Sequence, residues 1–599
     1  MRLPRFILAF MNRWLVVAFL AQPILRSQSL LDELEARAKA SLDHINHASS
    51  AEEANRAREP LRKNLEQSLG YRKLPWPPSL QPTLVGTVPG LGYRIEKIVF
   101  QTLPGTMVPA HLYLPEGLTA PAPAILFYNG HWWPDGKTRP DFQAFCINMA
   151  RFGFIVFNFD AFGQGERGIS SRDHRRTEAL LVGIAQQGIA EYESQCALEY
   201  LLSRQDVDRA RVGMTGASGG GYNTWITSAL DDRIRVVVPV VGTSEFFEQI
   251  HDSRRHDWYQ ASEHCHFVPG LIRYANNHEL LAAVAPRPLL IIAASVDQSF
   301  PIGGVRAVHQ YGQGLYRSYD ASGKIGLFVD TEEGHGYQIR KREAAYGWFL
   351  KWLMTKGDGR PYPEPSTVTL PFDAPQLRCF PPGQNQPAGP GIIGAVVRLA
   401  KIEKSPIHKE RLPTLKGRGT LVVLYDRGEE ASKSDPFVAT ARKLGWYIRY
   451  VDLTIEKPGW AFAVGLLLND NFVWREGTEV RRVIDSAPKD VMLYARGDHA
   501  ALAAVYALAQ GAPAKWAVLR EGFVSYSQFI ERPKSLALSF RLQKEDIREQ
   551  RKIGFDHEIP HEYFMFDGLN GGDLPVLLSK AKAKISIVDP IDGDWEPMH

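Results

Sequence analysis

The chain alternates short apolar runs with longer amphipathic stretches. The runs 124–128, 289–294 and 325–330 consist mostly of aliphatic and aromatic residues, which is typical of parallel strands buried on both faces of a sheet. Residues 340–353 follow the last of these runs with helical periodicity. Strands that alternate with helices predict an α/β fold, with a mostly parallel sheet and helices on both faces.

One junction between an apolar run and an amphipathic segment carries the motif Gly-x-Ser-x-Gly, at residues 216–220. The segment that follows, residues 222–230, predicts a helix directly after the turn. A flexible loop is one interpretation of the motif, but a strand before it and a helix after it indicate a nucleophile elbow. Larger side chains at the flanking glycines would collide with the neighbouring strand and helix. We therefore expect Ser218 to stand above the sheet in a strained backbone conformation, within reach of a base.

An acid and a histidine follow Ser218 in the chain order that this kind of turn requires. Asp297 comes just after the run 289–294, and His335 lies between two glycines after the run 325–330. Catalytic groups gather at the carboxyl ends of the strands in open α/β sheets. We predict that neutral His335 takes the proton of Ser218 and that Asp297 orients the imidazole ring.

Three other carboxylates lie near His335 in the sequence. They are Asp330, Glu332 and Glu333. They are too close to the histidine along the chain to match the usual topology of such a triad. We expect all three to be surface charges.

Acyl transfer through a tetrahedral intermediate needs two backbone N–H donors for the oxyanion. One is predicted at Gly219, which follows the serine at the start of the helix. The other should come from the loop after the run 124–128, where Gly130 allows a tight turn. The amide of His131 is the predicted second donor, and an ordinary loop histidine is the alternative.

Five segments together resemble the α/β-hydrolase superfamily, and in particular its acetyl xylan esterase and dienelactone-hydrolase-like branch. They are residues 128–131, 160–167, 216–220, 285–288 and 333–336, within a match over residues 85–355. Members often carry His-Gly-Tyr or His-Gly-Gly where this chain has Asn129, Gly130 and His131, so the second oxyanion donor departs from the family pattern. The resemblance implies a serine esterase that works through an acyl-enzyme on Ser218, without a metal ion or an organic cofactor.

Residues 1–29 have the layout of a secretory signal peptide, with arginines before an apolar stretch and small residues after it. The apolar stretch is too short and too interrupted for a comfortable transmembrane helix. We therefore expect an exported protein, secreted or periplasmic, with no stable membrane insertion after cleavage.

The length of 599 residues is too great for one hydrophobic core and predicts two large domains. Residues 30–84 predict an N-terminal helical segment and linker before a catalytic domain at 85–358. A Pro-rich stretch at 359–385 predicts a semi-rigid linker to a second domain at 386–599.

Composition adds little to this prediction. A net charge of +4 is small for this length and gives no argument for nucleic acid. The triplet His264-Cys265-His266 carries metal-ligating side chains, but the sequence offers no second cluster of ligands beside it. We therefore expect a loop or pocket wall there, and no metal site.

The resemblance and the expected export together imply an acetyl or similar small ester on a polysaccharide as substrate. Three tryptophans near the catalytic segments are candidates for stacking on sugar rings, although aromatic side chains are more often part of a core. They are Trp132, Trp133 and Trp258. A serine peptidase of the prolyl-oligopeptidase type is an alternative, but the N-terminal segment is too short for that family's β-propeller. A non-catalytic carbohydrate-binding or scaffold protein is a second alternative, and it fits the second half better than the first.

The second half repeats the first in outline. The segment 440–452 resembles 149–160, and the apolar run 491–495 leads into a helix as at the elbow. His499 is predicted to stand where Ser218 stands in the first half. We expect a degenerate α/β-hydrolase-like domain that is catalytically silent. The strand–helix rhythm common to all α/β domains is the alternative explanation.

Overall fold

The computed structural model describes residues 27–168, 178–256, 264–381, 391–399, 408–425, 429–455, 457–488, 490–522, 525–526 and 573–590. Residues 1–26 of the predicted signal peptide lie outside these ranges, and so does Trp258. Within the described ranges, no helix is both long and apolar enough to cross a membrane. We call residues 27–381 the first unit and residues 391–590 the second unit.

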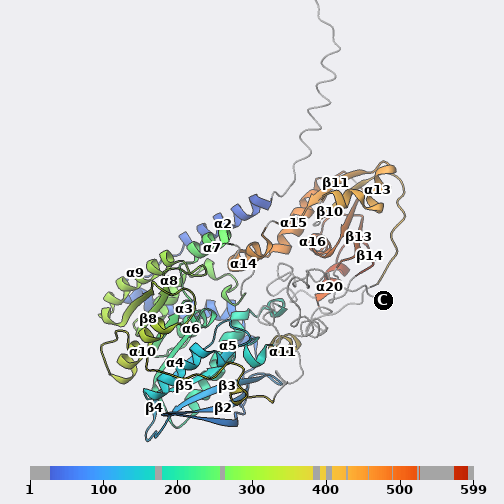
Figure 1. The fold of residues 1–599 in the computed structure, drawn as a ribbon. Helices are drawn as coiled ribbons and strands as arrows, with labels where there is room; N and C mark the ends of the chain where they lie inside the picture. Colours follow the sequence, from blue (N-terminus) through green and yellow to red (C-terminus); the bar gives the residue numbers. More distant parts are fainter. Residues whose placement is uncertain are drawn as a thin grey trace, which may run out of the picture.

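Among the described residues, nine strands form one sheet in the first unit (Figure 1). Their order is β1-β2-β3-β5-β4-β6-β7-β8-β9. The strands are β1 Thr83–Gly90, β2 Tyr93–Gln101, β3 Met107–Pro115, β4 Ala122–Tyr128, β5 Ile155–Phe159, β6 Val207–Ala217, β7 Val236–Val240, β8 Leu289–Ala294 and β9 Ile325–Asp330. The pairs β1–β2, β2–β3 and β3–β5 are antiparallel, and all pairs from β5 to β9 are parallel. The predicted mostly parallel α/β sheet is confirmed.

Helices cover both faces of this sheet (Figure 1). They are α4 Pro140–Arg151, α5 Gln186–Ser203, α6 Gly219–Leu230, α7 Phe246–His256, α8 Asn277–Val284, α9 Ile302–Ser318 and α10 Ile339–Met354. Successive side chains of a strand point to opposite faces. In β4, Ile125 and Phe127 share a core cluster with α4 and α10, whereas Leu126 shares one with α5, α6 and α8.

Two helices stand where the sequence predicts an N-terminal helical segment. They are α2 Ser27–Asp43 and α3 Ala51–Leu69. Ser50 caps α3, because its side-chain oxygen accepts the backbone N–H of Glu53. The apolar face of α3, with Leu65 fully buried, packs against α5 and α8. The two helices therefore add a further layer outside the helices on one face of the sheet.

The second unit contains a second sheet, with the strand order β11-β10-β12-β13-β14 and all pairs parallel. The strands are β10 Thr420–Tyr425, β11 Tyr447–Asp452, β12 Val491–Arg496, β13 Trp516–Arg520 and β14 Lys584–Val588. The helices are α11 Gly391–Leu399, α12 Glu429–Ser434, α13 Pro436–Lys443, α14 Pro458–Leu468, α15 Phe472–Asp485, α16 Asp498–Ala509 and α20 Leu574–Ser579. The order matches β5-β4-β6-β7-β8 of the first sheet, but flavodoxin-like folds share it. A second α/β unit is confirmed, and its origin by duplication stays a prediction.

The turn after β12 differs from the nucleophile elbow in one respect. Gly497 caps α16 with a φ of 99°, in the position that Ser218 holds before α6. The prediction that His499 stands where Ser218 stands is therefore wrong by two residues, since His499 already lies inside the helix. It is buried, and its Nε2 lies 2.6 Å from Oε2 of Glu476 on α15.

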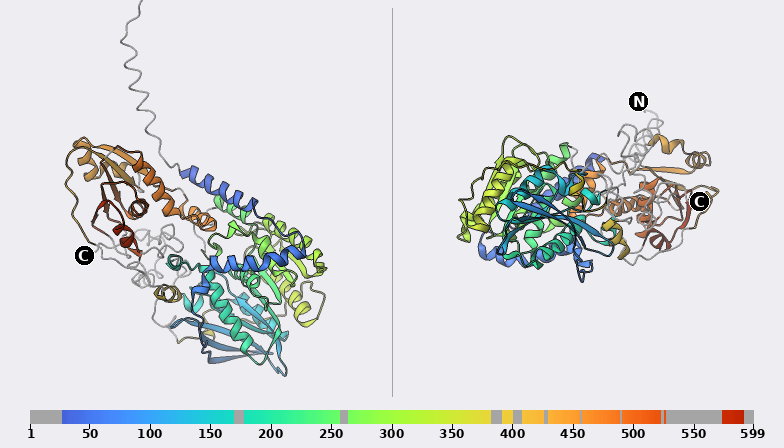
Figure 2. Two further views of the ribbon diagram at one scale, coloured as in Figure 1. Left: turned by 180° about the vertical axis from the view of Figure 1, so that it is seen from behind. Right: turned by 60° about the horizontal axis from the view of Figure 1, so that its bottom comes forward.

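The two units share one hydrophobic core at α14 (Figures 1 and 2). This helix packs on α2 and α7, and its side chains belong to the core cluster that also lies beneath the first sheet. Trp460 is fully buried, and its Nε1 donates to the carbonyl oxygen of Ile250 at 3.2 Å. The backbone N–H of Gly270 donates to the carbonyl oxygen of Leu466 at 2.8 Å. The second unit is thus docked on the first through buried apolar contacts.

The described part of the Pro-rich stretch, as far as residue 381, packs along the first unit. The Glu166 carboxylate accepts the backbone N–H groups of Cys379 and Phe380. The Nε2 of His111 donates to the carbonyl oxygen of Leu377 at 2.7 Å. Burial, together with the nearby positive charge of Lys137, lowers the pKa of His111 to about 3, so this ring is neutral.

Candidate active site

Ser218 occupies the turn between β6 and α6. Its φ of 58° and ψ of −124° are values that residues with a side chain rarely adopt, so the backbone is strained here. A Cβ added to Gly216 would lie 2.2 Å from the carbonyl oxygen of Tyr128, and one added to Gly220 would lie 2.1 Å from the same atom. These two glycines therefore allow the close approach of strand and helix that the turn requires.

The structure brings Asp297 and His335 together. Oδ2 of Asp297 lies 2.9 Å from Nδ1 of His335. The other carboxylate oxygen accepts the backbone N–H groups of Ser299 and Phe300. The carboxylate side chain is only 1% exposed, whereas the imidazole is 33% exposed. A carboxylate on Nδ1 holds the imidazole in the tautomer whose Nε2 can accept a proton.

Two aromatic rings flank the His335 imidazole. The ring centroid of Trp132 lies 6.2 Å away, and that of Phe300 lies 6.1 Å away, with an interplanar angle of 8°. Trp132 also packs edge-on against Phe142 and under the guanidinium of Arg139. Trp132 therefore supports the histidine ring, a role that sequence reasoning did not find beside its predicted contact with sugar.

Trp133 and Trp258 are the other two tryptophans that the sequence predicts to contact a sugar. Trp133 is half-buried, and its indole lies against backbone, because a Cβ added to Gly168 would lie 2.5 Å from its Cδ1. Trp258 is outside the described residues. Its predicted role stays a prediction.

The histidine loop is tied to the strand that carries the serine. The hydroxyl of Tyr337 lies 3.0 Å from Oγ1 of Thr215, which itself donates to the carbonyl oxygen of Val238. Both side chains are fully buried. In the part of the chain that the structure describes, Ser218 and His335 make no hydrogen bond with each other. Catalytic hydrogen bonds are often long until the substrate binds.

The three alternative acids near His335 have different surroundings. Glu332 is exposed and Glu333 is half-buried, but Asp330 is fully buried, and the prediction that it is a surface charge is wrong. Its Oδ2 accepts from Nζ of Lys341 at 3.0 Å, and its Oδ1 accepts the backbone N–H groups of Glu332 and Glu333. At the end of β9, under the first turn of α10, the carboxylate stabilises the loop that leads to the histidine.

The loop after β4 lies against the nucleophile elbow, where the oxyanion donors are predicted. A Cβ added to Gly130 would lie 3.2 Å from Cβ of Ser218. A Cβ added to Gly219 would lie 2.2 Å from Cε1 of the His131 ring. The His131 ring therefore packs against the backbone of Gly219, and the role of the two backbone N–H groups as oxyanion donors stays a prediction.

A buried ionic network supports the same loop, and no sequence motif predicts it. Nζ of Lys137 lies 2.8 Å from Oδ2 of Asp160 and 2.6 Å from Oε1 of Glu166. The lysine is fully buried. Burial by itself would raise the pKa of Glu166, but Lys137 and the backbone N–H groups of the Pro-rich stretch lower it to about 2. Charged residues after β5 were part of the family resemblance, but a loop lysine has no sequence pattern that indicates burial.

Comparison with known proteins shows the family of the chain. The chain matches the Abhydrolase family over residues 26–311. It is 30% identical over 256 residues to the putative hydrolase YtaP of Bacillus subtilis, an alignment that covers 41% of this chain and 83% of that protein. The chain belongs to the α/β-hydrolase family. The family match includes Ser218 and Asp297 and ends before His335.

Two methylesterases are also similar to this α/β-hydrolase. The 4-O-methyl-glucuronoyl methylesterase of Neurospora crassa is 25% identical over 183 residues, which is 28% of this chain and 46% of that protein. Among solved structures, Methylesterase BT1017 is 26% identical, with a TM-score of 0.48 over 61% of this chain and 78% of that one.

Proposed function

We propose that this α/β-hydrolase is a serine esterase that cleaves acetyl or similar small esters through an acyl-enzyme on Ser218. The observation that carries the proposal is the hydrogen bond between Asp297 and His335. Both residues follow strands whose carboxyl ends lie at the same edge of the sheet as the strained turn of Ser218. That edge is where α/β-hydrolases assemble a nucleophile, a base and an acid.

The mechanism follows from these positions. Nε2 of His335 takes the hydroxyl proton as Oγ of Ser218 attacks the ester carbonyl. The backbone N–H groups of Gly219 and His131 stabilise the oxyanion of the tetrahedral intermediate. The imidazolium, stabilised by Asp297, then protonates the departing alcohol. Water, activated by the same imidazole, hydrolyses the acyl-enzyme and restores Ser218.

The proposed alcohol or acid component is a saccharide. Trp132 packs beside His335, and Trp133 follows it in the chain. Both side chains are half-buried and are proposed to offer aromatic surface to a sugar ring. The relative from Neurospora crassa is named for a methyl ester on a glucuronoyl group. We therefore include methyl esters of sugar acids with acetyl esters in the class of small esters.

The proposal is tested with purified full-length protein on acetylated, methyl-esterified and feruloylated glycans, with Ser218→Ala as the matched variant. We expect the wild type to release acetate or methanol, and Ser218→Ala to be slower by at least about 10³-fold. A variant that keeps more than about a tenth of the activity would mean that another residue is the nucleophile. A wild type inactive on all three substrates would reject the esterase.

The second unit is proposed to be a degenerate α/β-hydrolase-like domain without chemistry of its own. Gly497 occupies its elbow-like turn, and His499 is engaged with Glu476. Residual activity of full-length Ser218→Ala reports on this proposal directly, because only the first unit is changed. Substantial ester hydrolysis that requires His499 in this variant would contradict it.

We also propose that the protein is exported, because residues 1–29 have the layout of a signal peptide. Expression of the full gene with a C-terminal tag should give a shortened chain in the periplasm or the medium. An uncleaved chain that stays in the cytoplasm would contradict the proposal.

A further inference from the structure

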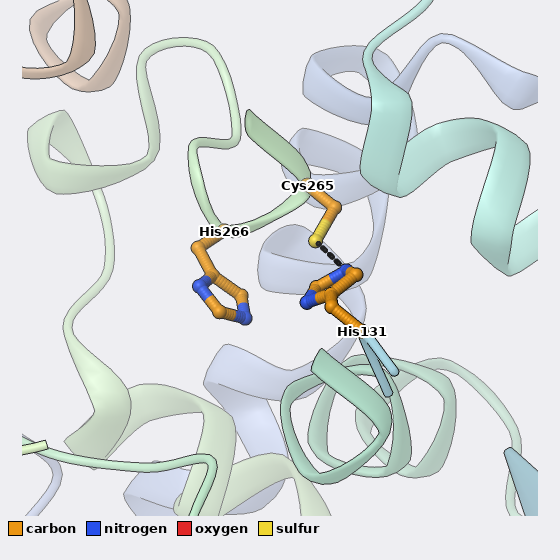
Figure 3. Close-up of side chains that lie close together, drawn as sticks. All are labelled: His131, Cys265 and His266. Atoms are coloured by element: carbon orange, nitrogen blue, oxygen red, sulfur yellow. Dashed lines mark hydrogen bonds between the residues drawn. The ribbon is translucent and has the colours of Figure 1, made fainter. Parts of the chain in front are cut away.

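Three metal-ligating side chains from two distant segments converge beside the elbow (Figure 3). His131 comes from the loop after β4, and Cys265 and His266 come from a short 3-10 helix at His264–His266. Their ligand atoms all lie within 4.8 Å of one another. Figure 3 shows the sulfur of Cys265 pointing at the His131 ring from above, with the His266 ring to the left of both.

We propose that His131, Cys265 and His266 bind one transition-metal ion of the zinc type. From the sequence alone we expect no metal at the His-Cys-His triplet, because no second cluster of ligands lies beside it in the chain. The fold supplies the missing ligand from a residue more than a hundred positions earlier. Only the folded chain brings these side chains together.

The donor set decides the class of ion. One thiolate and two imidazoles are soft to borderline ligands, which suit Zn²⁺ and its neighbours and do not suit Mg²⁺ or Ca²⁺. Three protein ligands leave one position of a tetrahedral ion for water or another small ligand. When the ion binds, the Cys265 sulfur–metal bond forms and the thiol proton passes to solvent.

The distances are compatible with a metal after small side-chain rotations. Ligand atoms on a tetrahedral zinc ion lie roughly 3.3–3.8 Å apart, as follows from metal–ligand bonds of about 2.0–2.3 Å. Sγ of Cys265 and Nε2 of His131 already lie 3.2 Å apart. The remaining ligand atoms, within 4.8 Å, need to move inward by about 1 Å, which changes of side-chain torsion supply.

Two of the three ligands are buried, and their backbone is anchored. Cys265 and His266 are each only 3% exposed. Edge-on contacts from Tyr222 and Phe300 surround the His266 ring. The segment continues to Gly270, whose backbone N–H forms a hydrogen bond with α14 of the second unit. Side chains on a buried and anchored backbone lose little conformational freedom when they bind an ion, so the entropy cost of binding is small.

The site adjoins the catalytic elbow. Nε2 of His131 would lie 2.7 Å from a Cβ added to Gly219. An ion bound to this nitrogen at about 2 Å is therefore a neighbour of the proposed oxyanion donors. The proposal itself concerns binding and does not depend on the esterase assignment.

The experiment titrates metal-free, full-length protein with Co²⁺ and competes the bound Co²⁺ with Zn²⁺. We expect one Co²⁺ per chain, a thiolate-to-metal charge-transfer band in the near ultraviolet, and loss of that band on addition of Zn²⁺. Cys265→Ala should lose the band, and His266→Gln should weaken binding by at least about tenfold. Cys196→Ser is the matched control, because Cys196 is a buried cysteine on α5, and it should bind like the wild type.

Circular dichroism of the metal-free variants shows whether they keep the wild-type fold. X-ray absorption at the zinc edge of the wild-type complex gives a result that needs no variant. One sulfur and two or more nitrogen or oxygen neighbours are expected. A coordination shell without sulfur, no saturable Co²⁺ binding, or folded Cys265→Ala with the wild-type band would overturn the proposal.

Discussion

The hydroxyl groups of Tyr337 and Thr215 lie 3.0 Å apart, between the loop of the proposed catalytic histidine and the strand β6. Tyr337 follows His335 by two positions, and Thr215 precedes Ser218 by three. The phenol ring is held separately, by stacking on Phe145 at a centroid separation of 5.2 Å. The hydroxyl contact therefore links the loop of His335 to the strand that leads to Ser218, while the phenol ring packs in the core.

We expect Tyr337→Phe to lower kcat for ester hydrolysis by about tenfold, because small misplacements of catalytic groups are costly. KM should stay unchanged, since the substrate surface is not altered, and this split separates a positioning role from a general loss of structure. The matched control is Tyr346→Phe on α10, which removes a buried hydroxyl that donates to Oε2 of Glu364. If both variants had the kcat of the wild type, Tyr337 would have no role in positioning His335.

Asp297→Asn should lower kcat by about 10³-fold or more, because the amide cannot stabilise the imidazolium or hold the same tautomer. Glu333→Gln should stay within about twofold of the wild type, as expected for a half-buried carboxylate without a catalytic role. Steady-state kinetics on a chromogenic acetate ester gives both values. If Glu333→Gln lost as much activity as Asp297→Asn, the assignment of Asp297 as the catalytic acid would be wrong.

Glu191 on α5 gives the fold a defined pH dependence. Its carboxylate accepts from Gln195 and from Oγ1 of Thr227, but burial dominates and raises its pKa from 4.5 to about 7. Between these two values the unfolded chain has lost the proton and the folded chain keeps it. The contribution to stability is therefore complete below about pH 4.5 and is lost as the pH rises through about 7.

We expect the free energy of unfolding of the wild type, relative to Glu191→Gln, to fall by about 3 kcal/mol between pH 4.5 and pH 8. Urea unfolding at several pH values measures the difference, because the variant carries a neutral side chain at every pH. Parallel stability curves for the two proteins would show that Glu191 does not titrate in this range.

Patterns that act locally could be read from the sequence. The apolar runs located β4, β8 and β9, and the glycine motif located the strained turn of Ser218, since each depends on a few neighbouring residues. The order of serine, acid and histidine along the chain also led to the pair Asp297 and His335, which the fold joins. Here the strand ends alone determine which side chains meet.

Contacts between distant segments could not be read in the same way. Asp330 resembles any carboxylate after a strand, and only the start of α10 above it makes it a buried partner of Lys341. The approach of His131 to Cys265 depends on how two loops fold over the sheet. The position of Gly497 depends on where β12 ends, and strand ends are the least certain feature of a sequence pattern.

The two units meet at α14. Trp460 on α14 is fully buried against α7, and the guanidinium of Arg254 lies 5.6 Å from its ring. Trp460→Ala should lower the free energy of unfolding by about 3–5 kcal/mol, the usual cost of removing a large buried aromatic side chain. Because the helix lies in the core of the first unit, we expect esterase activity to be lost at a lower temperature too.

Trp474→Ala is the control, since Trp474 belongs to the same unit but is 43% exposed. It should change the temperature at which the proposed esterase activity is lost only little, because substitutions of exposed residues usually change stability by about 0.5 kcal/mol or less. Removal of the second unit should have a larger effect than either substitution, because α14 covers apolar surfaces of α2 and α7. We therefore expect a chain that ends near Pro365 to aggregate. If Trp460→Ala left the inactivation temperature unchanged, the two units would be independent in stability, and the shared core would have no energetic consequence for the proposed active site.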